Sequence, residues 1–179
     1  TCSYNNGLQP HSTEFWNKIQ QIQQQGVVII VDDIFIGGGK TGTVFGWQNI
    51  PITPDITTQG KAITAGYFPL SITMYSERID SVLPKEFDWE HGFTYSFSLP
   101  GILSCHRYLD ILEQERVLQQ HQKVVSTATT VFEQQQYRIV GQYGTMFYLN
   151  RGADTQFFVV PINATEEYFN VLTEQLHGK

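Results

Sequence analysis

The feature that most constrains the fold is an apolar, β-branched run at residues 27–31 (Val-Val-Ile-Ile-Val), which ends in Asp32 and Asp33. Continuous apolar runs of this length are typical of strands covered on both faces, so the run predicts a central strand in a parallel sheet. In open α/β sheets, ligands bind outside the carboxyl ends of the strands. Asp32 is therefore a candidate site residue, although a strand-end aspartate also commonly caps the loop that follows it.

The segments around this run alternate between helical and strand patterns. Apolar residues recur at helical spacing over residues 14–25, after the cap candidates Ser12 and Thr13, and Gly26 ends the pattern. Short apolar segments at 56–59 and 70–74 predict two more strands. This alternation of helix, strand and loop predicts an α/β fold.

The second half of the chain has a different pattern. Residues 100–132 carry a long helical periodicity, and residues 137–149 and 157–160 predict strands of a small sheet. A last helix is expected from Thr165, with two glutamates in its first turn. We therefore expect a large-domain segment over residues 1–100, a long connecting helix over 101–133 and a small C-terminal domain over 134–179.

A lysine follows the second predicted strand. Lys61 comes directly after Gly60, at the end of the sequence Thr-Thr-Gln-Gly-Lys. A lysine at the rim of a cleft can lose hydration and become a nucleophilic amine. The other interpretation is an ordinary solvated loop lysine.

Asp32, Lys61 and the segments between them resemble class III, pyridoxal-phosphate-dependent aminotransferases in order and spacing. The segments are the glycine-rich loop at 37–42 (Gly-Gly-Gly-Lys-Thr-Gly) and residues 54–56 (Pro-Asp-Ile). Asp33 stands where the family usually has Glu, and Lys40 where it usually has Arg.

The resemblance continues on both sides of this region. Residues 6–10 (Asn-Gly-Leu-Gln-Pro) resemble the segment that leads to the family's aspartate strand. Residues 91–96 (His-Gly-Phe-Thr-Tyr-Ser) resemble its His-Gly-x-Thr-Tyr-Ser motif, although Phe-Ser-Leu-Pro at 97–100 departs from the Gly-His-Pro that usually follows.

The resemblance implies part of a fold type I large domain, with a mostly parallel sheet and helices, followed by a small α+β segment. It implies pyridoxal 5'-phosphate as cofactor, Lys61 as the catalytic residue that forms the Schiff base, and Asp32 as the partner of the ring nitrogen. Thr94 would reach the cofactor phosphate of a neighbouring subunit. Arg151, ten positions before Pro161, would bind a substrate carboxylate, or else lie in a surface turn with Gly152. The implied reaction transfers an amino group from a donor to a keto or aldehyde acceptor.

The resemblance covers only part of the family's chain. The family's N-terminal half holds the phosphate at a helix N-terminus and stacks an aromatic residue on the cofactor ring, and neither has an equivalent in these 179 residues. The chain is then a fragment, half of a split enzyme, or a reduced relative without activity. Each case predicts a homodimer or a partner chain, because a sheet without its full set of strands has an open edge. The alternative function is a non-catalytic structural or assembly protein derived from an aminotransferase.

Composition excludes several other classes. The net charge is -6 and the pI about 5.2, so neither nucleic acid nor an acidic membrane is expected as a partner. The longest apolar run is too short to span a bilayer. Two cysteines and the lack of a recognisable signal peptide predict a cytoplasmic protein.

Two other sites are considered and set aside. Gly39, Lys40 and Thr41 resemble the end of a P-loop, but that motif needs glycine where Ile34 stands. The five histidines show no paired ligand spacing, so no metal site is expected.

Overall fold

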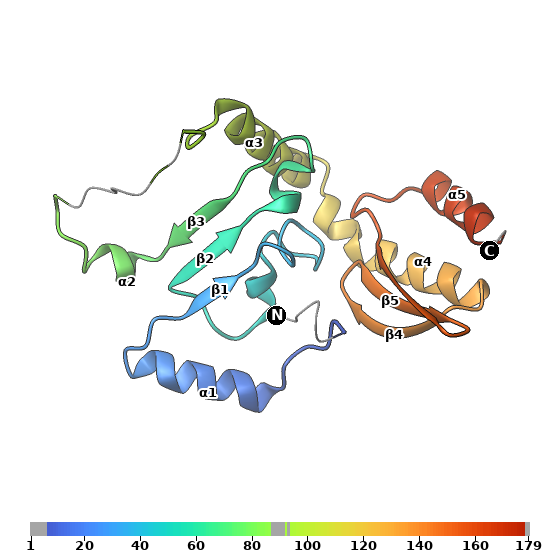
Figure 1. Ribbon diagram of the computed structural model, residues 1–179, viewed down its shortest axis with the longest axis horizontal. Helices are drawn as coiled ribbons and strands as arrows, with labels where there is room; N and C mark the ends of the chain where they lie inside the picture. The colour runs from blue at the N-terminus through green and yellow to red at the C-terminus, as the bar shows by residue number, and fades with distance from the viewer. Residues whose placement is uncertain (1–6, 87–91, 93, 178–179) are drawn as a thin grey trace.

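Two three-stranded sheets organise the computed structural model, which describes residues 7–86, 92 and 94–177 (Figure 1). The first sheet has the order β1-β2-β3 and the second the order β4-β5-β6. The strands are β1 Ile30–Asp32, β2 Ile56–Gln59, β3 Ile72–Tyr75, β4 Arg138–Tyr143, β5 Met146–Arg151 and β6 Asp154–Val159. The helices are α1 Thr13–Gln24, α2 Glu77–Asp80, α3 Leu99–Gln114, α4 His121–Gln134 and α5 Glu166–His177, with 3-10 turns η2 Gly46–Asn49, η3 Lys61–Thr64 and η4 Val117–Gln120. The predicted α/β fold is confirmed.

The first sheet is mixed. β1 pairs in parallel with β2, with Asp32 opposite Thr58, and β2 pairs antiparallel with β3. The predicted parallel strand is confirmed, but its predicted central position is wrong, because β1 is at the edge of this sheet within the described residues. Val31 is 8% exposed, whereas Ile30 on the opposite face is 63% exposed. The run is apolar on both faces, yet the described chain covers only one of them.

The first helix begins and ends as the sequence predicts. Ser12 accepts a hydrogen bond from the Phe15 amide at 3.3 Å, and Gly26 adopts a φ of 99° just after the helix. The last helix, α5, likewise carries its two glutamates in the first turn.

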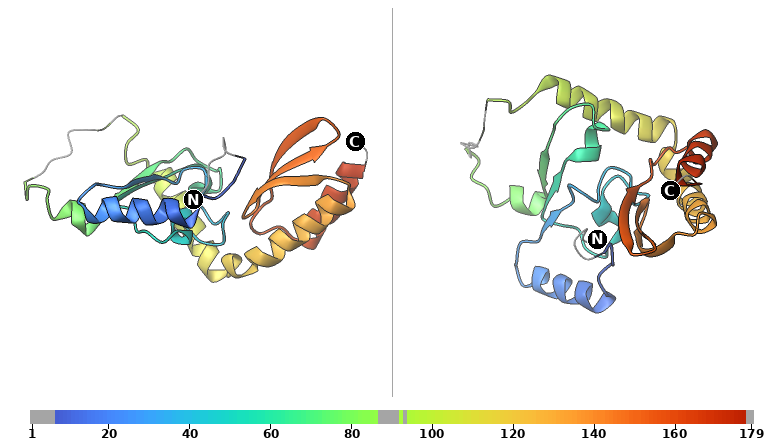
Figure 2. Two further views of the ribbon diagram at one scale, coloured as in Figure 1. Left: turned by 90° about the horizontal axis from the view of Figure 1, so that it is seen from below. Right: turned by 45° about the vertical axis from the view of Figure 1, so that its right-hand side comes forward.

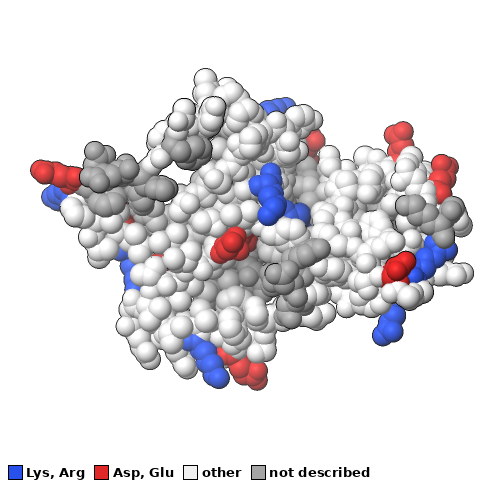
Figure 3. All heavy atoms as spheres, viewed as in Figure 1, with Lys and Arg blue, Asp and Glu red and all other residues white. Residues whose placement is uncertain are grey.

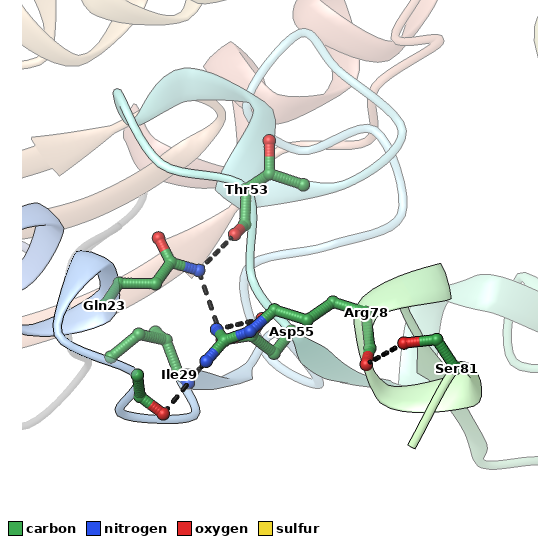
Figure 4. Close-up of polar contacts among 7 residues, drawn as sticks. Gln23, Ile29, Thr53, Asp55, Arg78 and Ser81 are labelled. Carbon is green, nitrogen blue, oxygen red and sulfur yellow. Dashed lines mark hydrogen bonds and ion pairs between the residues drawn. The ribbon is translucent and has the colours of Figure 1, made fainter. Parts of the chain in front are cut away.

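A buried carboxylate ties α1 and α2 to the first sheet (Figure 4). Asp55 accepts hydrogen bonds from the Ile29 amide at 2.8 Å, from Gln23 at 3.2 Å and from Arg78 at 2.7 Å. Burial raises the pKa of Asp55, but these hydrogen bonds and the charge of Arg78 outweigh it, and the pKa lies below its ordinary value. Asp55 therefore stays ionised and fixes the point where the β2 segment begins.

The single helix expected over residues 100–132 is two helices. α3 ends at Gln114, Arg116 turns the chain with a φ of 50°, and η4 leads into α4. The apolar periodicity is similar on both sides of the turn, so periodicity alone did not reveal the break. Figure 2 shows α3 and α4 leading from the first sheet to the second.

The larger core belongs to the C-terminal unit, where α4 and α5 pack on β4–β6. The strands expected at 137–149 and 157–160 are confirmed, with the first divided at Gly144, whose φ is 58°. This core contains twelve buried residues: Val124, Val125, Ala128, Val131, Phe132, Tyr137, Phe147, Leu149, Val160, Phe169, Leu172 and Leu176.

The glycine-rich loop after β1 joins the two units. The carbonyl of Lys40 accepts a hydrogen bond from the Thr145 amide at 2.9 Å and lies 3.0 Å from a ring nitrogen of His121. Leu8, Ile36 and Met146 form a second, smaller buried cluster beside it. The loop is thus held by both halves of the chain.

Charged side chains are scattered over the face shown in Figure 3. Within the described ranges, no helix is long and apolar enough to cross a membrane. The same residues contain no group of three or more His, Cys, Asp or Glu side chains that could hold a metal ion.

Candidate functional site

Parallel pairing brings two of the predicted site residues to one edge of the first sheet. Asp32 lies opposite Thr58 in the register of β1 and β2, and Lys61 follows Thr58 by three positions. Because parallel strands end at the same edge, the aspartate and the lysine lie at the carboxyl edge together.

Asp32 is exposed and has local partners. Its Oδ1 accepts a hydrogen bond from the Ile34 amide at 3.1 Å and lies 3.5 Å from the Thr58 hydroxyl. The first contact is the loop-capping role expected of a strand-end aspartate. The second links the carboxylate to the neighbouring strand.

Lys61 begins η3 and is exposed, with a φ of 45°. Its Nζ lies 5.6 Å from the centre of the Phe35 ring, in the loop that follows Asp32. A side chain at Gly38 would come within 2.6 Å of the Ala62 Cβ, so the loop after β1 packs closely on the segment that contains Lys61. These contacts show that the two segments form one local structure.

Beneath this edge lies a buried polar bridge between Asp33 and Gln59. Asp33 Oδ2 accepts hydrogen bonds from Gln59 Nε2 and from the Gly46 amide, both at 2.7 Å. Asp33 is 0% exposed and Gln59 1% exposed. Burial raises the pKa of Asp33, and the hydrogen bonds oppose this rise only in part.

Lys40 is buried near the same carboxylate. Its ammonium donates to the carbonyl of Gly37 at 2.5 Å. Burial lowers the pKa of Lys40 to about 8, while the charge of Asp33 acts to raise it and that of Lys61 to lower it. The two positions that depart from the family motif, Asp33 and Lys40, therefore interact electrostatically with each other.

Thr94 is exposed and lies in the turn before α3. Its motif neighbours His91 and Phe93, like Asn6 of the N-terminal motif, lie outside the described residues. Figure 1 shows the segment before α3 apart from the carboxyl ends of β1 and β2. The role of Thr94 at the cofactor phosphate of a neighbouring subunit stays a prediction.

Arg151 is also apart from this edge. Its guanidinium donates to the carbonyl of Leu176 at 3.1 Å and lies 5.3 Å from the centre of the Tyr137 ring. Leu176 is in the last turn of α5, beside the C-terminus on the far side of the molecule from β1 and β2 (Figure 1). In this arrangement Arg151 binds the end of α5, and its substrate role stays a prediction.

The sequence reasoning missed Asp33 and Gln59 as site residues. Successive strand residues point to opposite faces, so an outward Asp32 places Asp33 inward. The same alternation buries Thr57 and Gln59 on β2. The sequence signal for this bridge was a pair of polar residues, Asp33 and Gln59, at inward-facing positions near the ends of two predicted strands.

Comparison with known proteins identifies the family. A model described as aminotransferase class-III matches residues 3–155. An uncharacterized aminotransferase, y4uB of Sinorhizobium fredii, is 36% identical over 114 residues, which are 61% of this chain and 24% of that protein. The adenosylmethionine-8-amino-7-oxononanoate aminotransferase of Nitratidesulfovibrio vulgaris is 35% identical over 100 residues, 54% of this chain and 18% of the relative.

Solved structures show the same fold. The chain matches a crystal structure of adenosylmethionine-8-amino-7-oxononanoate aminotransferase from Methanocaldococcus jannaschii with a TM-score of 0.80 and 20% identity, over 97% of this chain and 50% of that one. It matches an omega-transaminase from Thermomicrobium roseum with a TM-score of 0.73 and 22% identity, over 90% and 45% of the two chains. The chain thus spans about half of these structures and a quarter or less of the two curated relatives. With most of its length matched by the family model, this chain belongs to the class-III aminotransferases.

Proposed function

We propose that this chain supplies the lysine-bearing half of a pyridoxal-phosphate-dependent aminotransferase. Lys61 is the amine that joins the cofactor, and Asp32 is the partner of its ring nitrogen. The observation that carries the proposal is the register of β1 and β2, which places Asp32 opposite Thr58 and so brings both residues to one edge.

The residues at this edge fit the cofactor by their chemistry. The cofactor needs a primary amine for its aldehyde and a carboxylate for its ring nitrogen. Lys61 and Asp32 supply one of each, and both residues are exposed rather than buried. The loop between them packs tightly at Gly38 and Ala62, which limits how far the amine and the carboxylate can separate.

The chain's own residues then have distinct tasks. When bound, pyridoxal phosphate supplies an electron sink for the substrate's α-carbon. Asp32, as a carboxylate, holds the proton on the ring nitrogen. Lys61 takes a proton from the substrate as a general base and returns it as a general acid. An amino donor and a keto or aldehyde acceptor are the proposed substrates.

The rest of the site is proposed to come from residues outside these 179, either elsewhere in the same polypeptide or in a partner chain. The open face of β1 supports this, with Ile30 63% and Val28 43% exposed. The matched structures are about twice as long as the region they share with this chain, which also supports a missing half. A homodimer in the cytoplasm, in which Thr94 reaches the phosphate of the neighbouring subunit, completes the proposal.

A spectroscopic titration tests the proposal. Purified protein is mixed with pyridoxal phosphate, and the visible absorption band of the lysine adduct is recorded for the wild type, Lys61→Ala and Lys18→Ala. Lys18 is an exposed lysine on α1 and serves as the matched control. A band lost only in Lys61→Ala is expected. A folded wild type without a band, or a band that persists in Lys61→Ala, would overturn the proposal and favour the non-catalytic structural role.

A further inference from the structure

The buried bridge beneath the edge connects the two site residues through their chain neighbours. Asp33 directly follows Asp32, and Gln59 precedes Lys61 by two positions. The side chains of Asp33 and Gln59 meet at 2.7 Å, completely inside the protein. A short, buried hydrogen bond to a carboxylate is among the stronger kinds in proteins. It joins the ends of β1 and β2 at the point where the backbone hydrogen bond from Asp33 to Thr58 ends the ladder.

This bridge is not a simple contribution to stability. Asp33 Oδ1 and Gln59 Oε1 are buried and have no hydrogen-bond partner among the described residues. Unpaired buried acceptors oppose folding, and burial also raises the pKa of Asp33. The geometry of the bridge therefore calls for another explanation.

The backbone after Gln59 gives that explanation. Lys61 is held at a φ of 45°, and the 3-10 turn that it begins buries Ile63 and Thr64 to 2% exposure each. A strained residue keeps its conformation only where the structure around it fixes the chain on both sides. The buried turn fixes the chain after Lys61, and the bridge fixes it before Lys61.

We infer that Asp33 and Gln59 are positioning residues, which set the separation of the Asp32 carboxylate and the Lys61 amine. The inference deepens the proposed function and rests on it for its chemical meaning. The positioning itself is a property of the folded chain and can be measured without cofactor. Displacements of about 1 Å at a reacting group can reduce rates by about 100-fold, so such a bridge has a large effect on the site.

The test compares two buried glutamines. Gln59→Met keeps the length of the side chain and removes the donor to Asp33. The matched control is Gln135→Met, because Gln135 is 7% exposed and contacts His177 in the C-terminal unit. Hydrogen exchange is measured at the Asp33 and Ile63 amides, which bond to the carbonyls of Thr58 and Gly60. The Lys61-dependent visible band is measured in the same samples.

Gln59→Met is expected to speed exchange at both amides by about tenfold and to lower the equilibrium constant for the visible band by about tenfold, the effect of losing one buried hydrogen bond. Gln135→Met is expected to leave both unchanged. The inference would be overturned if these amides exchanged in Gln59→Met at the wild-type rate. It would also be overturned if Gln59→Met and Gln135→Met changed the exchange rates equally. If the wild type gives no band, the proposed function fails, and the exchange rates alone decide the positioning role. If Gln59→Met does not fold, Asp33→Ala, which removes both acceptor oxygens, is measured with the same expected direction.

Discussion

At the scale of the residue, Lys61 is one of several non-glycine residues whose backbone conformation is one that side chains disfavour. Its φ of 45° lies in the left-handed region, which costs an L-residue about 1–2 kcal/mol relative to the right-handed one. Residues held in this way are concentrated at functional sites, where the surrounding structure maintains the strain. The strain at Lys61 is thus a stability cost that accompanies the exposed amine.

Replacing Lys61 by glycine should therefore stabilise the fold relative to alanine. Lys61→Gly removes the conflict between the Cβ and the backbone, whereas Lys61→Ala keeps it, and both lose the amine. We expect Lys61→Gly to be more stable than Lys61→Ala by about 1 kcal/mol in urea unfolding. At Ala62, which does not have a positive φ, substitution by glycine should instead destabilise the protein. Equal stabilities of the two Lys61 variants would contradict the strain.

The buried ammonium of Lys40 should make stability depend on pH. The folded-state pKa is about 8 and the ordinary value is 10.5, so between these values the unfolded chain binds more protons than the folded chain. Stability should then rise as the pH increases from 8 towards 10, by at most about 3 kcal/mol, and this contribution is lost as the pH falls through 8. Urea unfolding at several pH values should show a flatter rise in Lys40→Met than in Lys18→Met. A slope unchanged in Lys40→Met would show that Lys40 titrates normally.

At the scale of the element, sequence patterns located most helices and strands but not their surroundings. Alternation and capping predicted α1, β2 and α5, because those signals are local. The edge position of β1 was missed. An apolar run indicates that a strand favours burial, but it does not show whether these residues include the neighbouring strand that would bury it. The left-handed turn at Arg116 was missed for a related reason: no glycine or proline marks it. The Asp33–Gln59 bridge depends on register, which a single strand does not encode.

The hairpin between β4 and β5 contains a glycine that the glycine-rich loop approaches closely. A Cβ at Gly144 would lie 2.0 Å from the Lys40 carbonyl oxygen, whereas one at Gly152 would meet open space. Both glycines have positive φ, 58° and 65°. Gly152→Ala should therefore cost about 1 kcal/mol from backbone conformation alone, and Gly144→Ala at least about 2 kcal/mol more. Thermal or urea unfolding measures the difference, and similar losses in the two variants would show that the loop yields to the new methyl group.

At the scale of the whole molecule, the two units differ in how completely their apolar side chains are buried. The C-terminal unit encloses a twelve-residue core between α4, α5 and its sheet, while β1 leaves Ile30 facing solvent. Exposed apolar strands at a sheet edge are sites of association. The first sheet therefore has an open apolar face that is suited to association.

The purified chain should self-associate through this face when no partner is present. Ile30→Lys should shift sedimentation towards the monomer at micromolar concentration, because a charge on an edge strand opposes pairing. Val171→Lys is the control, since Val171 is 47% exposed on α5 in the other unit. Association that is unchanged by Ile30→Lys and reduced by Val171→Lys would place the contact on the C-terminal unit instead.

The small cluster of Leu8, Ile36 and Met146 has a consequence for synthesis of the protein. Ile36 and Met146 are 110 positions apart (146 minus 36), and the chain between them must be translated before the cluster can close. At about 5–20 residues per second, this takes roughly 5–20 s. During that interval the loop beside Asp32 has been synthesised, but Met146, which later packs against Ile36, has not. The segment that contains Asp32 and Lys61 is therefore synthesised well before its apolar contact with Met146 can form.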